Sequence, residues 1–171
     1  KFSNNKIINI YPIINLKKIK KDSYVYIGFD NLVLKVIEVL REDLIISKVI
    51  TEGYLESNKG VHVSNILSLD ALTKKDTEAI KIARRHNLKY FAMSFVNKGK
   101  DIELLKKKIN KKCFIISKIE TKNALKNLSE ISRKSDALLI DRGDLSRYIA
   151  IENIPFIQET IAKYTKKIIN H

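Results

Sequence analysis

Lys118 and Glu120 stand two positions apart at the end of the apolar run CFIISKI, residues 113–119. If this run is a strand, side chains two positions apart point to the same face, roughly 6–7 Å from one another. One face of the strand then carries Phe114, Ile116, Lys118 and Glu120. Its first two residues are apolar, and the two at the carboxyl end are charged. A lysine beside a carboxylate at a strand end suits phosphoryl and metal chemistry. The alternative is a surface ion pair, which is common in a chain so rich in lysine.

A second charged cluster, DRGD at 141–144, ends the next apolar run, DALLID at 136–141. Gly143 lets the backbone approach a ligand closely. A helical turn starting near Asp144 would offer free N–H groups to a phosphate or carboxylate. Glu120 and Asp144, at the ends of adjacent strands, are a pair of carboxylates that could hold one Mg²⁺. The alternative for the RGD tripeptide is an exposed turn.

The elements that must position these residues repeat evenly, since the expected strands start at 90, 113 and 136, which is every 23 residues. Helical periods lie between them, and Thr73 with Asp76 has the spacing of a capping box. Continuous apolar strands that alternate with amphipathic helices indicate parallel β/α units. The expected strands are 90–96, 113–119 and 136–141, and the expected helices are 76–87, 101–110, 122–133 and about 154–168.

The even period and the polar residues at strand ends favour a barrel over an open sheet. A complete barrel needs eight such units, and about three are present. Before residue 60, short Val-, Ile- and Tyr-rich runs at 24–29, 31–40 and 44–50 predict a small β-rich module. The predicted fold class is therefore α/β: a partial TIM-type (β/α) barrel, residues 60–171, preceded by a β-rich domain, residues 1–59. We expect an open arc of parallel strands that other residues complete.

Composition limits the class of protein. With 171 residues and 44% hydrophobic content, the chain can bury a core. Its net charge of +14 fits either a polyanionic partner or a lysine-rich composition spread over solvated faces. The lysine clusters have no interleaved aromatic residues, which argues against a nucleic-acid partner. No apolar run reaches the length of a membrane span and no secretory signal opens the chain, so we expect a cytoplasmic or organellar location. The single cysteine, Cys113, is expected to be a core thiol.

Four blocks, in this order and spacing, resemble pyruvate kinase. They are KGVHVSNILSLDALTKKDTEAI (59–80), YFAMSFV (90–96), IISKIET (115–121) and DALLIDRGDLS (136–146). The earlier stretch YVYIGFDNLVLKV is similar to the latter part of the lid domain that this family inserts into its barrel. The resemblance covers nearly the whole chain, most strongly residues 59–160. It implies that residues 1–59 are a portion of the lid and residues 60–171 a portion of the barrel.

The resemblance implies a Mg²⁺- or Mn²⁺-dependent enzyme of glycolysis that transfers the phosphoryl group of phosphoenolpyruvate to ADP, giving pyruvate and ATP. Lys118 matches the lysine that stabilises the transferring group and the enolate. Glu120 and Asp144 match the metal ligands, and Gly143 with Asp144 and the amides around them matches the cradle of the substrate carboxylate. The chain would be only part of the catalytic unit, with the rest of the barrel from the same gene or another chain. A homo-oligomer is expected for the full-length form, and the need for K⁺ stays open because that site region is absent.

Several positions depart from the family pattern. The acids of the family's lid motif align with Gly28 and Phe29, and the strand that follows the RGD block is expected to lie beyond His171. Four further positions differ from the family: Asn97, Asp141, Ser146 and Tyr148. Asp141 stands where the family has an alanine.

These departures leave two alternatives open. One is a degenerate half-barrel that serves as a scaffold and uses its basic surface to hold nucleic acid or a protein. The other is an aldolase-like enzyme that acts on the enolate of pyruvate. Retention of Lys118, Glu120 and Asp144 favours an enzyme.

Overall fold

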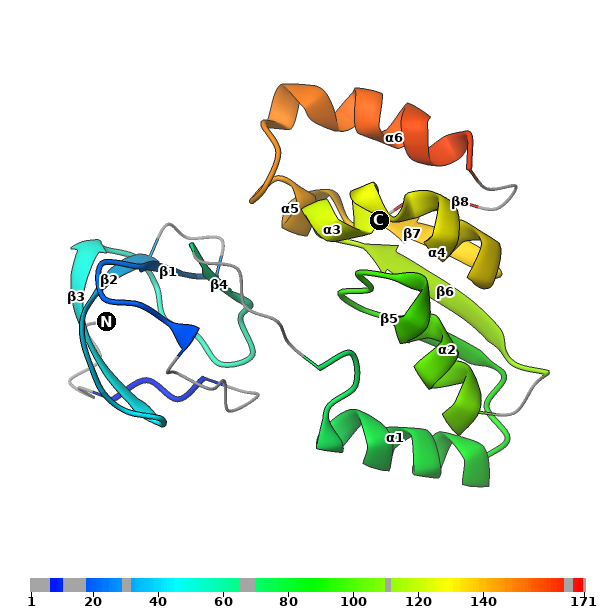
Figure 1. Ribbon diagram of the computed structural model, residues 1–171, viewed down its shortest axis with the longest axis horizontal. Coiled ribbons are helices and arrows are strands. Elements are labelled where there is room, and N and C mark those ends of the chain that lie inside the picture. The colour runs from blue at the N-terminus through cyan, green and yellow to red at the C-terminus, as the bar shows by residue number, and fades with distance from the viewer. Residues whose placement is uncertain are drawn as a thin grey trace. The chain divides into compact units, whose positions relative to one another are not determined.

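The computed structural model describes residues 7–10, 18–28, 32–64, 70–109, 112–164 and 168–170. The chain divides into two compact units, residues 1–69 and 70–171, each with its own sheet and hydrophobic core (Figure 1). The boundary falls ten residues later than the one expected from the sequence. The reason is that the short strand Val61–Val63 pairs with residues Val25–Ile27, so it belongs to the first unit.

The first unit is a four-stranded antiparallel sheet in the order β3-β2-β1-β4. Its strands are β1 (Tyr24–Ile27), β2 (Leu32–Arg41), β3 (Leu44–Thr51) and β4 (Val61–Val63). Along β1, Val25 and Ile27 are buried whereas the two tyrosines are exposed, as expected for a sheet with one covered face. β1 is followed by Gly28, whose φ of 66° is in the left-handed region that favours glycine. Phe29, the other lid position singled out from the sequence, lies outside the described residues.

The second unit holds a parallel sheet in the order β5-β6-β7-β8. Its strands are β5 (Tyr90–Met93), β6 (Phe114–Ile119), β7 (Ala137–Ile140) and β8 (Ile168–Asn170). The first three start within one residue of the expected positions. The expectation that the next strand lies beyond His171 is wrong, because β8 pairs with β7 over Leu138–Ile140. A strand of three residues has no periodicity that a sequence pattern could detect.

Helices follow the strands as the 23-residue period predicts. They are α1 (Lys74–Arg85), α2 (Gly99–Lys108), α3 (Lys122–Lys126), α4 (Leu128–Lys134), α5 (Arg142–Leu145) and α6 (Ile154–Ala162), with a 3₁₀ turn, η2, at Ile151–Asn153. The predicted capping box is confirmed, since Thr73 and Asp76 cap α1 reciprocally. The single helix expected over 122–133 is two helices that meet at Asn127. The last helix ends at Ala162, six residues earlier than expected.

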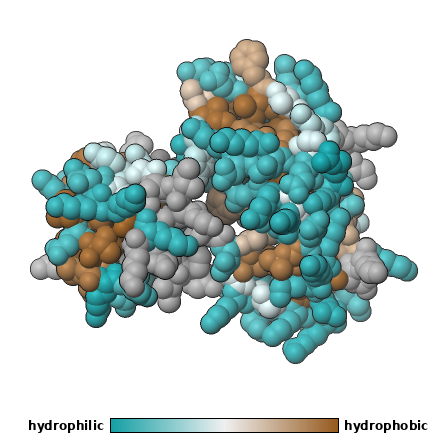
Figure 2. Space-filling view, in the orientation of Figure 1, coloured by the Kyte–Doolittle hydropathy of each residue, from teal (hydrophilic) through white to brown (hydrophobic). Residues whose placement is uncertain are grey.

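The helices cover one face of the sheet. Ile115 and Ile119 of β6 and Leu138 of β7 are at most 1% exposed, and they pack in one cluster with residues of α1, α2, α4 and α6. The alternate residues of β6 are half-buried and point to the other face. On the face visible in Figure 2, hydrophilic residues are spread over the helices and interrupted by smaller hydrophobic areas. The predicted class, a partial (β/α) barrel after a β-rich domain, is confirmed.

Candidate active site

Lys118 and Glu120 lie at the carboxyl end of β6, on the face that the helices leave open. Lys118 Nζ is 2.6 Å from Glu120 Oε1, and the two side chains are 21% and 1% exposed. The sequence left a surface ion pair as the alternative to a functional pair. The structure forms the ion pair but buries its carboxylate, and desolvating a carboxylate costs free energy that a surface pair avoids.

Glu120 is held from a second direction by the turn that follows β5. The backbone N–H of Phe95 donates a hydrogen bond to Glu120 Oε2. Phe95 has a φ of 53°, which is uncommon for a bulky residue and costs backbone free energy. Burial raises the pKa of Glu120, and the contacts with Lys118 and the Phe95 N–H offset this only in part. A left-handed Phe has no sequence signature, so sequence reasoning missed this contact.

Asp141 is the second carboxylate on Lys118. Its Oδ2 lies 3.1 Å from Lys118 Nζ, and its Oδ1 accepts a hydrogen bond of 3.2 Å from the backbone N–H of Asp144. Asp141 thus caps the short helix α5. The sequence marked Asp141 only as a departure from the family pattern. The parallel register could have revealed the contact, because Lys118 is opposite Leu139, which places Glu120 opposite Asp141.

Three carboxylates therefore meet at this end of the sheet. Glu120, Asp141 and Asp144 each offer an oxygen, and these oxygens lie within 4.8 Å of one another. Asp144 Oδ1 also lies 3.4 Å from Arg147 Nε. Burial raises the pKa of Asp144, as does the nearby charge of Asp141, against the opposing charges of Arg147 and Lys118.

This donor set fits Mg²⁺ or Mn²⁺. All the ligand atoms are carboxylate oxygens, which hard cations prefer, and Mg²⁺ takes its ligands at about 2.0–2.1 Å. The three oxygens lie within 4.8 Å of one another, so one cation could draw ligands from more than one of these side chains. Of the predicted site residues, Glu120 and Asp144 meet as expected, and Asp141 joins them.

The other predicted residues lie beside this group. Burial alone would lower the pKa of Lys118, but the hydrogen bonds and charges of Glu120 and Asp141 outweigh it and raise the pKa, so Lys118 is a cation at neutral pH. Gly143 is exposed on α5, and its carbonyl accepts a hydrogen bond of 2.7 Å from Ser146 Oγ. Gly143 thus lies in the turn between Asp141, which contacts Lys118, and Asp144.

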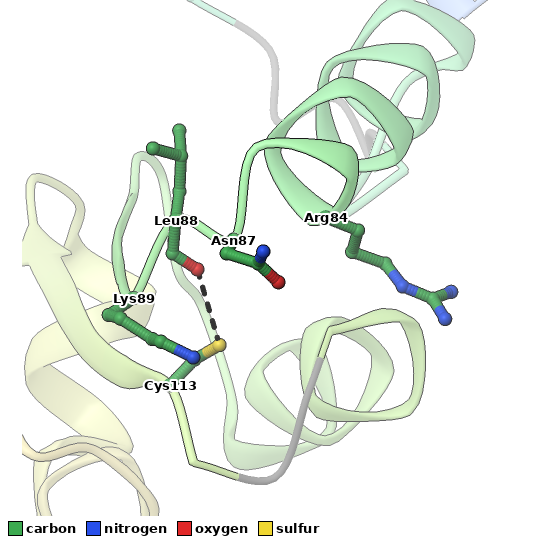
Figure 3. Close-up of a pocket in the computed structure, with 5 residues that line it drawn as sticks. All are labelled: Arg84, Asn87, Leu88, Lys89 and Cys113. Atoms are coloured by element: carbon green, nitrogen blue, oxygen red, sulfur yellow. Dashed lines mark hydrogen bonds between the residues drawn. The ribbon is translucent and has the colours of Figure 1, made fainter.

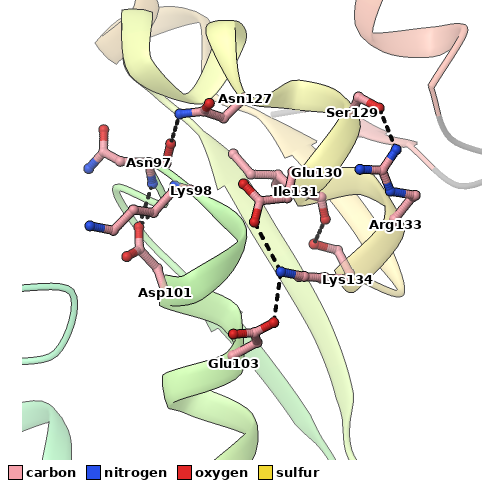
Figure 4. A network of polar contacts seen from close by, with 11 residues as sticks. Asn97, Lys98, Asp101, Glu103, Asn127, Ser129, Glu130, Ile131, Arg133 and Lys134 are labelled. Atoms are coloured by element: carbon pink, nitrogen blue, oxygen red, sulfur yellow. Dashed lines mark hydrogen bonds and ion pairs between the residues drawn. The ribbon is translucent and has the colours of Figure 1, made fainter.

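A polar network fixes the loops around this end of the sheet (Figure 4). Asn97, after β5, accepts a hydrogen bond of 2.7 Å at Oδ1 from Thr121 Oγ1, and its carbonyl accepts one of 2.8 Å from Asn127 Nδ2. The backbone N–H of Asn97 donates to Asp101 of α2. Asn97 therefore joins the loop after β5 to the segment after β6 that carries Glu120. The sequence marked Asn97 only as a departure from the family.

Cys113 lies at the amino end of β6, opposite to the end that carries Lys118. It is half-buried and packs against the core cluster, with its Sγ 3.6 Å from the carbonyl oxygen of Leu88. It lines a cavity of about 220 Å³ (Figure 3), together with Arg84, Asn87, Leu88 and Lys89. This cavity contains none of the predicted site residues.

In the part of the chain that the structure describes, no helix is long and apolar enough to cross a membrane. Residues 1–170 match the family profile described as pyruvate kinase, barrel domain. Among curated proteins, the chain is 35% identical over 167 residues to the pyruvate kinase of Thermotoga maritima, a match that covers 95% of this chain and 36% of that protein. It is 34% identical over 157 residues to the pyruvate kinase of Methanocaldococcus jannaschii, covering 90% of this chain and 35% of that protein.

Among solved structures, a pyruvate kinase from Cryptosporidium parvum matches with a TM-score of 0.71 and 26% identity. The match covers 91% of this chain and 35% of that one. The chain thus spans about a third of the length of the relatives it matches. The fold, the converging strand-end residues and these matches agree, and the chain belongs to the pyruvate kinase family.

Proposed function

We propose that the protein containing this chain transfers the phosphoryl group of phosphoenolpyruvate to ADP, giving pyruvate and ATP in glycolysis. In this proposal the chain supplies part of the catalytic unit. The chief support is that Lys118, Glu120 and Asp144 converge at the carboxyl ends of β6 and β7 in a member of the pyruvate kinase family. A scaffold would not require these three side chains to converge.

Glu120 and Asp144 would hold the divalent cation, Mg²⁺ or Mn²⁺. When bound, the cation supplies positive charge to the oxygens of the reacting groups. Glu120 is suited to this role because Phe95 fixes one of its oxygens from the neighbouring loop. Asp144 is fixed by Arg147 and by the cap that Asp141 gives to α5.

Lys118 would neutralise the charge that develops during the transfer. The bond between phosphorus and the enol oxygen breaks, and a bond from phosphorus to an oxygen of the ADP β-phosphate forms. The enolate that remains then takes a proton at its methylene carbon and becomes pyruvate. A cationic Lys118 stabilises both the transferring group and the enolate oxygen without losing its own proton. In the same proposal, Gly143 and Asp144 hold the substrate carboxylate through backbone N–H groups.

The remaining parts of the proposal concern partners and location. The rest of the barrel would come from the same gene or from another chain, and the full-length form would be a homo-oligomer in the cytoplasm or an organelle. A requirement for K⁺ stays open. Neither nucleic acid nor a membrane is proposed as a partner.

A coupled assay for pyruvate tests the proposal on three proteins: the 171-residue chain, the full-length protein, and the full-length protein with Lys118→Met. We expect turnover only from the unsubstituted full-length protein. Lys134→Met is the matched control, since Lys134 also contacts two carboxylates, Glu103 at 2.7 Å and Glu130 at 3.0 Å, but on a helix surface (Figure 4). Full activity of the Lys118 variant would contradict the proposed role.

The metal site has its own test. Mn²⁺ binding to the full-length protein is measured by paramagnetic relaxation, with and without oxalate, a mimic of the enolate. Glu120→Gln combined with Asp144→Asn should abolish binding, because two carboxylate ligands become neutral amides that bind Mn²⁺ weakly. Unchanged Mn²⁺ affinity in this double variant would show that the cation binds elsewhere.

A further inference from the structure

Asp141 binds two donors that the proposed function assigns to the substrate, the ammonium of Lys118 and the backbone N–H of Asp144. Its Oδ2 is 3.1 Å from Lys118 Nζ, and its Oδ1 accepts the backbone N–H of Asp144 at 3.2 Å. Resting on the proposed function, we infer that Asp141 is an internal carboxylate that competes with the anionic groups of the substrate for these two donors. Asp141 thereby lowers the affinity of the site for phosphoenolpyruvate.

The number of donors explains why the competition is direct. The backbone N–H of Asp144 is one donor, so it bonds well either to Asp141 Oδ1 or to a substrate carboxylate. Lys118 has three donors, and the carboxylates of Glu120 and Asp141 take up two of them. An anionic substrate that approaches Lys118 therefore finds one position open and the other two filled by negative groups.

Charge acts in the same direction. Phosphoenolpyruvate carries a carboxylate and a phosphate, and Asp141 adds a third negative charge to those of Glu120 and Asp144 within 4.8 Å. A negative charge this close to the site opposes the binding of an anion, and the effect weakens as water enters the site.

The capping contact decides which variant is informative. Asp141→Asn keeps an oxygen that can accept the N–H of Asp144, and Asn is a good N-cap, so α5 keeps its start. The negative charge is lost, and with it the acceptor that Oδ2 offers to Lys118. Asp141→Ala removes both the charge and the competing acceptor, but it also removes the cap. Agreement between the two variants therefore separates competition from a change in folding.

The experiment measures oxalate affinity in the full-length protein at a Mn²⁺ concentration that saturates each variant. We expect Asp141→Asn to bind oxalate about tenfold more tightly than the parent, and Asp141→Ala at least as tightly as Asp141→Asn. The KM for phosphoenolpyruvate should fall in parallel, which loss of a structural contact would not produce. Glu103→Gln is the matched control, because it removes the same charge from another carboxylate paired with a lysine, and it should leave oxalate affinity unchanged.

Two outcomes overturn the inference in distinguishable ways. If the unsubstituted protein binds oxalate and Asp141→Asn binds it equally or more weakly, Asp141 does not compete with the substrate, and the proposed function stands. If neither the parent nor any variant binds oxalate at saturating Mn²⁺, the proposed function fails, and the role of Asp141 fails with it.

Discussion

Replacing Lys118 by Met should destabilise the second unit by an amount that depends on pH. The substitution keeps the length of the side chain but leaves the carboxylate of Glu120, 1% exposed, without the cation that lies 2.6 Å away. An uncompensated buried charge is strongly destabilising. Glu120 can escape this penalty by taking a proton, so the cost of that proton sets the upper limit of the penalty for its buried charge.

This limit follows from the ordinary pKa of a glutamate, 4.5. Protonating such a group costs about 1.4 kcal/mol for each pH unit above its pKa. The upper limit is therefore about 3.4 kcal/mol at pH 7, about 2 kcal/mol at pH 6 and about 0.7 kcal/mol at pH 5. At an m-value of about 2 kcal/mol/M, the urea midpoint at pH 7 should fall by roughly 1–2 M.

Urea unfolding of the metal-free protein, followed by circular dichroism at pH 5, 6 and 7, measures this dependence. Adding Glu120→Gln to Lys118→Met should restore most of the lost stability, because the buried group is then neutral. Lys134→Met, the surface control, should show a small loss that does not vary over this pH range. A penalty independent of pH, or a double variant as unstable as Lys118→Met alone, would refute the reasoning.

Three further predictions test contacts that stabilise the second unit. Asp136→Ala should cost about 1–2 kcal/mol, because the N–H of buried Ile115 loses its 2.8 Å acceptor, and the exchange of that amide hydrogen should speed up. Thr73→Ala should cost about 1 kcal/mol through loss of the α1 cap, whereas Thr73→Ser should be nearly neutral in urea unfolding. Asn97→Ala should leave the hydroxyl of Thr121 without its 2.7 Å acceptor. Hydrogen exchange of the amides after β6 should then speed up, whereas exchange of the amides in α1 should stay unchanged.

Most of the second unit could be predicted because its signals are local. Alternating residues in β6 placed Lys118 and Glu120 on one face, and the 23-residue period placed Asp144 at the adjacent strand end. Elements held by distant partners could not be predicted. β4 is assigned to the first unit only by pairing with β1, and β8 only by pairing with β7.

The geometry of the candidate site could be predicted in part for the same reason. The positions of Glu120 and Asp144 at adjacent strand ends indicated that their side chains lie close together. The contact of Asp141 with Lys118 depends on the register between β6 and β7, which residue patterns within each strand do not determine. The hydrogen bond from Phe95 depends on a backbone conformation that Phe seldom adopts, so no residue preference points to it.

The two-residue alternation of β6 also determines where the chain can change length during evolution. One residue inserted within β6 would turn Lys118 and Glu120 toward the helices and bring Ile119 to the open face. The same insertion in the turn between α1 and β5 would leave every strand in its register, because Tyr90 pairs with Phe114 independently of how the chain reaches it. We therefore expect insertions and deletions among natural variants to gather at the amino ends of the strands, near Asn87 and Lys112, and to be absent from β6.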